Sequence, residues 1–245
     1  MGAPFFLVTN KLRSATVLSE DTITDFDFEN ALDGKTSTQA GFAAGASRVV
    51  VLDFGTAQTV SHIAYAAHNL TGATILIESS TDNSSYTTRL STTAIAGVNT
   101  HEFTSFNERY FRLTLSGLAG NTYVSDFFAG EAIELPHGMP FGFIPPELAD
   151  EDEIDVNMTG NGSTVGITVN SRPKRISVNM RDYLATWFDT NWLTLINGLK
   201  LYPGYFLWGE SKRAMFCTID KKAPKPSYTN HLYMSAKLDL EGFVE

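Results

Sequence analysis

The sequence predicts a mainly β protein, with an N-terminal β-sandwich of the jelly-roll kind followed by a C-terminal α+β domain. Short apolar segments with a two-residue alternation recur through the first half, and clusters of Gly, Ser, Asn and Thr separate them. A long 3.6-residue period occurs only after residue 180. The chain has 245 residues, which is comfortable for two domains.

The segment 110–115 shows the alternation most clearly. Phe111, Leu113 and Leu115 share one face, and polar or amphipathic residues occupy the other, as in a half-buried strand. Similar strand signals lie at residues 60–65 and 75–77, and turn-forming clusters lie at 79–85 and 97–100.

A Pro-rich segment, 136–146, and the acidic run 150–153 indicate the boundary between the two domains. Proline fixes φ and removes a backbone donor, so regular structure should stop there. The aromatic residues within the segment indicate a strap packed on a surface. We therefore expect a sandwich over 1–135, a connector over 136–155 and an assembly domain over 156–245.

The second half contains one amphipathic helix. Its apolar positions recur at steps of three, four and eight residues, with Asp182 as the expected N-cap and Gly198 as the expected C-terminal stop. Strand signals lie on both sides, so we expect one helix on an antiparallel sheet. The helix positions are Leu184, Trp187, Phe188, Trp192, Leu195, Ile196 and Leu199, and the strands are 176–180, 205–208, 215–219 and 231–241.

Charge and cysteine content narrow the function classes. The net charge is −9, but residues 131–155 hold eight acidic residues and no Lys or Arg, whereas 156–245 hold eleven Lys or Arg against seven Asp or Glu. Nucleic-acid binding is disfavoured, because phosphate contact needs a concentrated basic surface. No apolar segment is long enough for a transmembrane helix, and we expect no cleaved signal peptide, because the first residues have no basic or sufficiently long apolar region. Cys217 is the single cysteine, and we expect it to be a buried strand thiol.

The sequence argues against an enzyme. The five histidines are scattered, and no zinc-protease, phosphate-loop, dinucleotide-binding or nucleophile-elbow motif is present. The acidic run 150–155 contains several carboxylates, but adjacent acids in a Pro-flanked connector are typical of a solvated segment. We assign no catalytic residue.

Five sequence blocks, in this order, resemble the discoidin-like, or coagulation-factor type C, family of galactose-binding-like sandwiches. The blocks are residues 31–38, 49–55, 75–82, 109–114 and 131–135, and together they span about half of the chain. Asp33-Gly34 matches the family's Asp-Gly turn. Gln39 stands where members have a tryptophan after Thr38, so part of the usual packing must differ.

The resemblance implies a ligand-binding site in loops at one end of the sandwich, with Phe42, His68, Asn69 and Tyr86 as its contributors. Phe42 and Tyr86 are also open to an interpretation as ordinary core or rim packing. Some family members hold a structural calcium ion, and the matching residues are Asp33, Thr38 and Glu131. Apart from this calcium, no cofactor is expected.

The second half resembles phage tail-tube modules, which place one helix against a β-sandwich and form rings. From this we predict a non-enzymatic structural protein of a bacteriophage tail tip or baseplate, made in the bacterial cytoplasm and located in the virion tail. The expected partners are other tail proteins, copies of itself in a ring and a host surface glycan. The alternative is a bacterial carbohydrate-binding module with an accessory domain.

Overall fold

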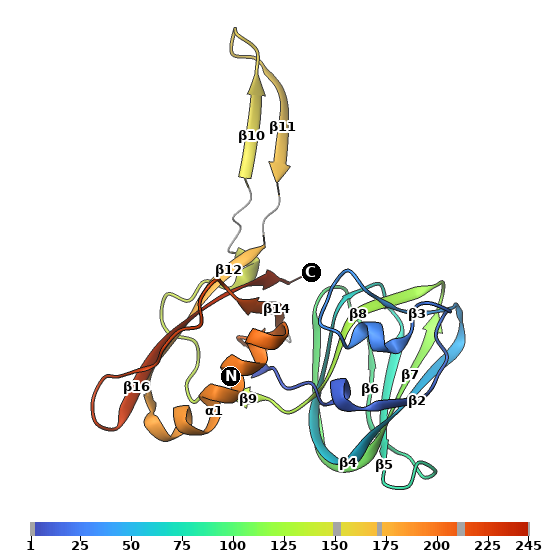
Figure 1. The fold of residues 1–245 in the computed structure, drawn as a ribbon. Helices are drawn as coiled ribbons and strands as arrows, with labels where there is room; N and C mark the ends of the chain where they lie inside the picture. Colours follow the sequence, from blue (N-terminus) through green and yellow to red (C-terminus); the bar gives the residue numbers. More distant parts are fainter. Residues whose placement is uncertain (1–2, 149–152, 171–172, 210–213, 245) are drawn as a thin grey trace.

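The protein is mainly β, with an N-terminal β-sandwich and a C-terminal α+β domain, as the sequence predicts (Figure 1). The computed structural model describes residues 3–148, 153–170, 173–209 and 214–244. Within these residues, no helix is both long and apolar enough to cross a membrane.

Two long strands organise the sandwich, because each bends and takes part in two layers. The first half of β4 (Gly45–His68) pairs with β2 (Thr16–Glu20), and its second half pairs with β8 (Thr122–Gly130). Strand β7 (Asn99–Leu118) pairs with both halves of β4. The register shifts between Asp53 and Gln58, where Gly55 has a φ of 74°. A β-bulge with a left-handed glycine bends a strand in this way. The remaining strands are β3 (Ala40–Phe42), β5 (Thr74–Ser80) and β6 (Thr87–Thr93).

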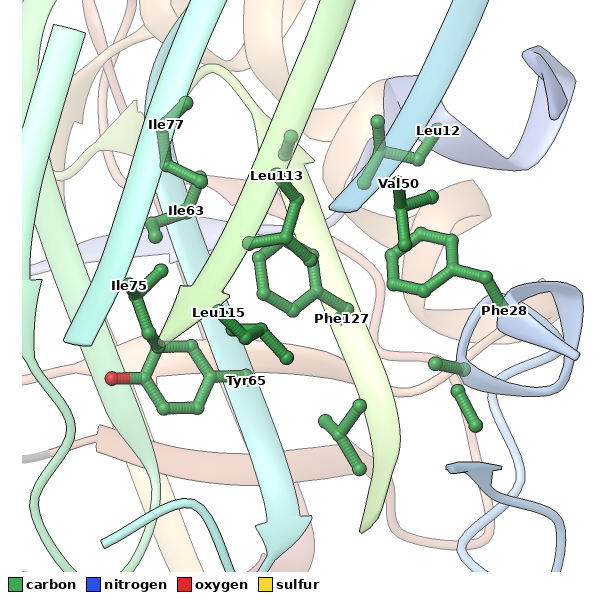
Figure 2. Close-up of a cluster of buried hydrophobic side chains, with 14 of the residues drawn as sticks. Leu12, Phe28, Val50, Ile63, Tyr65, Ile75, Ile77, Leu113, Leu115 and Phe127 are labelled. Carbon is green, nitrogen blue, oxygen red and sulfur yellow. The ribbon is translucent and has the colours of Figure 1, made fainter. Parts of the chain in front are cut away.

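The sandwich core follows the predicted alternation. Phe111, Leu113 and Leu115 are buried, whereas Arg112 and Thr114 between them are partly exposed. Figure 2 shows this core, which brings together Ile75 and Ile77 of β5, Tyr65 of β4 and Phe127 of β8. Two short 3-10 helices, η1 (Lys11–Ser14) and η2 (Phe28–Ala31), close one side of the core with buried Leu12 and Phe28.

The C-terminal domain has its own sheet, in the order β12-β16-β14-β13-β1-β9, and β15 also pairs with β16. The predicted division, with residues 1–135 all in the sandwich, does not hold for the first strand of the chain. This strand pairs with β13 and β9 and not with the sandwich. Residues 5–7 are too short and too apolar to show this by sequence alone. The strands are β1 (Phe5–Leu7), β9 (Ile133–Glu134), β12 (Lys174–Leu184), β13 (Gly204–Leu207), β14 (Ala214–Ile219), β15 (Ser227–Tyr228) and β16 (Tyr233–Phe243).

The predicted helix is α1 (Ala185–Leu201), and it packs on β12, β14 and β16. Both predicted ends were wrong. Asp182 adopts a φ of 55° inside an irregular part of β12 and accepts a hydrogen bond from Thr229 Oγ1, while Leu184 holds the N-cap position. Gly198 lies within the helix and does not end it. A side chain at this position would press on Val8, which explains why the residue is a glycine.

The connector packs on the C-terminal domain as a strap. Phe143 stacks edge-on against Phe206, and the ring of His137 meets that of Tyr183. Residues 150–152 of the acidic run lie outside the described residues. The strand β10 (Glu153–Met158) begins within the predicted connector and pairs with β11 (Thr164–Asn170) in a separate hairpin that projects from the domain (Figure 1).

The two domains meet in a buried junction. Leu7, Tyr205 and Phe216 pack against Ala64 and Phe128 of the sandwich. Because this contact is apolar and continuous, it differs from the wet, polar interface of two domains that move independently.

Candidate functional site

The structure does not bring the four predicted ligand residues together. Phe42 is fully buried, packed near Phe28, and belongs to the sandwich core. His68 and Asn69 lie at the end of β4, where their polar atoms hold neighbouring loops: His68 Nε2 lies 2.8 Å from the Gly97 carbonyl oxygen, and Asn69 Oδ1 accepts a hydrogen bond from the Tyr123 N–H at 2.6 Å. Burial lowers the pKa of His68, so the neutral ring suits this structural role.

Tyr86 lies in the turn between β5 and β6, apart from the loop that holds Asn69. The guanidinium of Arg112 lies 3.8 Å from the centre of its ring, and Arg112 Nε donates to Glu78 Oε2 at 2.6 Å. The phenol donates to Asn83 Oδ1 at 2.5 Å. These contacts favour the packing interpretation of Tyr86, because one face of its ring is already covered.

The residues implied for calcium do not form a ligand set. Asp33 Oδ1 accepts from the Lys35 N–H and Oδ2 from Thr38 Oγ1, both at 2.8 Å. Asp126 of β8 lies close enough to Asp33 for their charges to interact, and Glu131 lies five residues beyond Asp126, or about 17 Å along an extended chain. Calcium needs six to eight oxygens around one point. Within the described ranges, no group of three or more His, Cys, Asp or Glu is placed to hold a metal ion.

A pocket of about 480 Å³ lies where the sandwich meets the C-terminal sheet. Its lining combines apolar residues from both domains with polar residues of β6 and β7. The apolar residues are Phe5, Leu90 and Leu207, and the polar ones include Ser91, Thr100 and Glu102. The size and the mixture of a broad apolar surface with a few polar groups are typical of small-molecule sites at domain junctions.

Thr100 is the most informative residue of this junction pocket. Its side chain is 3% exposed, and its Oγ1 has no hydrogen-bond partner among the described residues. A buried hydroxyl without a partner costs about 1–3 kcal/mol, so such groups call for a physical explanation. The Oγ1 atom itself is buried beneath the pocket surface, so a ligand hydroxyl would reach it only after a small shift of the lining side chains.

Two histidines, His62 and His101, lie near the polar residues of the pocket. His62 pairs in register with Glu102, its Nδ1 lies 2.8 Å from Ser61 Oγ, and its ring lies 5.0 Å from that of Phe5. Burial lowers the pKa of His62, and the charges of Glu102 and Glu134 oppose this. His101 also lines the pocket, with Nε2 at 3.1 Å from the Tyr65 hydroxyl. The junction therefore combines imidazole rings, hydroxyl groups and a carboxylate.

The sequence offered little sign of this pocket. Its lining comes from residues 3, 5, 90–92, 100–102, 207 and 209, and no motif links these segments. The register of β1 beside β13 places Phe5 next to Leu207, and that pairing depends on the whole fold.

The comparisons with known proteins concern the sandwich. No family model matches the chain, and no curated protein does either. Among solved structures, a chitosan-binding module of a chitosanase/glucanase from Paenibacillus sp. IK-5 is 22% identical, with 50% of this chain and 99% of that one covered and a TM-score of 0.43. The module CBM32-1 of a family 31 glycoside hydrolase from Clostridium perfringens is 18% identical, covering 51% and 99%, with a TM-score of 0.44. Both similar structures are carbohydrate-binding modules, and each covers about half of this chain.

Proposed function

We propose that the protein is a non-catalytic carbohydrate-binding protein and that the junction pocket holds a neutral sugar ring. The observation that carries this proposal is the junction pocket itself, whose lining mixes apolar side chains with hydroxyl groups and includes the buried Thr100, whose hydroxyl has no partner among the described residues. The discoidin-like sequence blocks support it, because members of that family are predominantly ligand-binding sandwiches.

A pyranose ring matches the mixed apolar and polar lining of the junction pocket. Its C–H face is apolar and suits Phe5 and Leu207, whereas its hydroxyl edge can exchange hydrogen bonds with Thr100 and Ser91. The carboxylate of Glu102 accepts from sugar hydroxyls and disfavours acidic sugars, because like charges repel at short range. Neutral sugars are therefore the expected class.

The test is a glycan array followed by calorimetric titration of the full chain with the best neutral glycan. Thr100→Val keeps the side-chain shape and removes the hydroxyl, so we expect equal or greater stability together with at least a tenfold loss of affinity, or about 1.4 kcal/mol. Thr104→Val is the matched control, since Thr104 is exposed on the same strand and does not line the pocket.

Two results would count against the proposal. If the wild-type chain binds no glycan on the array, carbohydrate binding is wrong. If Thr100→Val binds as tightly as the wild type, the sandwich binds sugar elsewhere and the junction pocket is not the site.

A second candidate function is the structural role in a bacteriophage tail tip or baseplate, with the virion as its location. The observation that favours it is the projecting hairpin, whose aliphatic side chains are exposed, because such surfaces mark contacts with other proteins. The genes beside this one distinguish the two candidates. Tail-tube and tape-measure genes would support the tail, and a polysaccharide-utilisation cluster would support the free binding module.

A further inference from the structure

The hairpin of β10 and β11 ends in a tight turn that contains an Asn-Gly step. The Thr159 N–H donates to the Ser163 carbonyl oxygen at 2.8 Å, so residues 160–162 form the loop. Every residue of this loop is exposed, and a Cβ added at either of its glycines would meet nothing within 4 Å. Asn161 and Gly162 therefore lie in open space at the end of the projecting hairpin (Figure 1).

An asparagine that precedes a glycine can lose its side-chain amide without an enzyme. The backbone nitrogen of Gly162 attacks Asn161 Cγ, the Cγ–Nδ2 bond breaks, and the proton of the backbone nitrogen leaves with the amide as ammonia. Water then opens the five-membered succinimide at one of its two carbonyl carbons, which yields aspartate or isoaspartate. No oxidant or reductant is consumed. Glycine permits the attack best, because it has no Cβ beside the attacking nitrogen.

Two hydrogen bonds of the turn act on the reacting groups in opposite ways. Thr159 Oγ1 donates to Asn161 Oδ1, which draws electron density from Cγ and favours attack. The Gly162 N–H donates to the Thr159 carbonyl oxygen at 2.9 Å, and Gly162 is held at a φ of 84°. Because this second bond engages the attacking nitrogen, the turn must open briefly before the reaction.

The structure indicates that this opening costs little free energy. Strands β10 and β11 form a sheet of their own, and within the described ranges they pair only with each other. A two-stranded hairpin is at best marginally stable in water. Its apolar side chains give no support from a core, since Ile154 and Val169 are 62% and 54% exposed. Segments with few buried contacts open locally well below the free energy of global unfolding.

The sequence contains one other Asn-Gly step, Asn197-Gly198, and the structure places it in the opposite environment. Asn197 is exposed, but it lies in the last two turns of α1, where the backbone is fixed by the helix. Its neighbours Ile196 and Leu199 are buried in the core, and an added Cβ at Gly198 would lie 2.8 Å from the Val8 Cβ. Opening the chain here requires the helix to leave the sheet.

We propose that Asn161 is a site of spontaneous deamidation in the folded protein and that Asn197 is protected. The reaction adds a negative charge to residues 153–170, which contain Glu153 and Asp155 and no Lys or Arg. Isoaspartate also lengthens the backbone of the loop that sets the hairpin register. The projecting hairpin therefore changes in charge and geometry as the protein ages.

The test is peptide mapping by mass spectrometry of the full chain, sampled during incubation at mildly alkaline pH. Each event replaces NH₂ by OH and adds about 1 Da. Asn157 is the reference within the hairpin, because it is exposed but precedes methionine. The same incubation in concentrated urea is the reference without structure. Asn161→Gln is the matched variant, since its longer side chain would have to close a six-membered ring.

We expect Asn161 to deamidate with first-order kinetics and to give both aspartate and isoaspartate. In the folded chain its rate should exceed that of Asn197 by about tenfold or more, which corresponds to at least about 1.4 kcal/mol in the free energy of opening. In urea the two Asn-Gly steps should react at similar rates. The Asn161→Gln chain should show no mass gain in the hairpin peptide.

Three results would overturn the proposal. The first is a folded chain in which Asn161 reacts no faster than Asn157, because the turn then blocks the attack. The second is equal reaction of Asn161 and Asn197 in the folded chain. The third is an Asn197 that stays slower in urea, since the difference would then come from the local sequence and not from the fold. Glycan binding enters none of these readouts, so this modification and the proposed function fail independently.

Discussion

Tyr205 of β13 donates its phenolic hydrogen bond to the carboxylate of Asp126 in β8 at 2.6 Å, and this bond crosses the junction between the two domains. Arg13 of the sandwich lies 3.4 Å from the same carboxylate, and its guanidinium covers the ring of Tyr202 at 3.9 Å. Burial raises the pKa of Asp126 to about 6, although the Tyr205 hydrogen bond and Arg13 lower it. The stability of the contact between the two domains should therefore depend on the protonation of Asp126, and so on pH.

Asp126→Asn should change how stability depends on pH. The pKa of this group is 3.8 when unfolded and about 6 when folded, so its stabilising contribution is complete below about pH 4 and declines as the pH rises through 6. The expected decline is about 3 kcal/mol, and the asparagine variant lacks it. Urea denaturation from pH 4 to pH 8 measures the difference between the two proteins. A difference that stays constant over this range would contradict the prediction.

Tyr205→Phe should destabilise the junction at neutral pH. The buried carboxylate loses its shortest hydrogen bond, which costs about 1.5–3 kcal/mol for a charged acceptor. Tyr202→Phe is the control, because its ring still stacks under Arg13 and its exposed hydroxyl makes little contribution. Chemical denaturation of both variants at pH 7.5 provides the measurement, and equal stabilities would show that the bond across the junction is unimportant.

Gly198→Ala should destabilise the protein although alanine favours helices. An added Cβ would lie 2.8 Å from the Val8 Cβ and 3.1 Å from the Val8 carbonyl oxygen. We expect a loss of about 1–3 kcal/mol, which outweighs the helix gain of about 1 kcal/mol. The neighbouring Asn197→Ala is exposed and should gain a few tenths of a kcal/mol. A Gly198 variant with a higher melting temperature than the wild type would refute this packing of α1 on Val8.

Calcium should leave the melting temperature unchanged. Both carboxylate oxygens of Asp33 accept hydrogen bonds within its own loop, and among the described residues no group of three or more His, Cys, Asp or Glu is placed to hold a metal ion. Thermal melts in calcium and in chelator provide the comparison. A saturable rise in melting temperature with calcium would restore the ion that the family resemblance implies.

Much of the fold could be predicted from local patterns, whereas the site could not. The alternation at Phe111, Leu113 and Leu115 and the helical spacing of Phe188 and Trp192 each correspond to a buried face in the structure. Those patterns work because a strand or a helix must bury one side whatever its neighbours are. The predicted ligand residues failed as a group because Phe42 is in the core and His68 holds a loop.

The sequence by itself determined the β-sandwich, the single helix laid on a sheet and the buried position of Cys217, since each depends on periodicity within one segment. Only the tertiary structure decided that residues 5–7 leave the sandwich and join β13, that Asp126 meets Tyr205, and that Thr100 lies at a pocket shared by both domains. The physical reason is that these contacts join segments far apart in the chain. Their register is set by the packing of the complete molecule, and no single segment carries it.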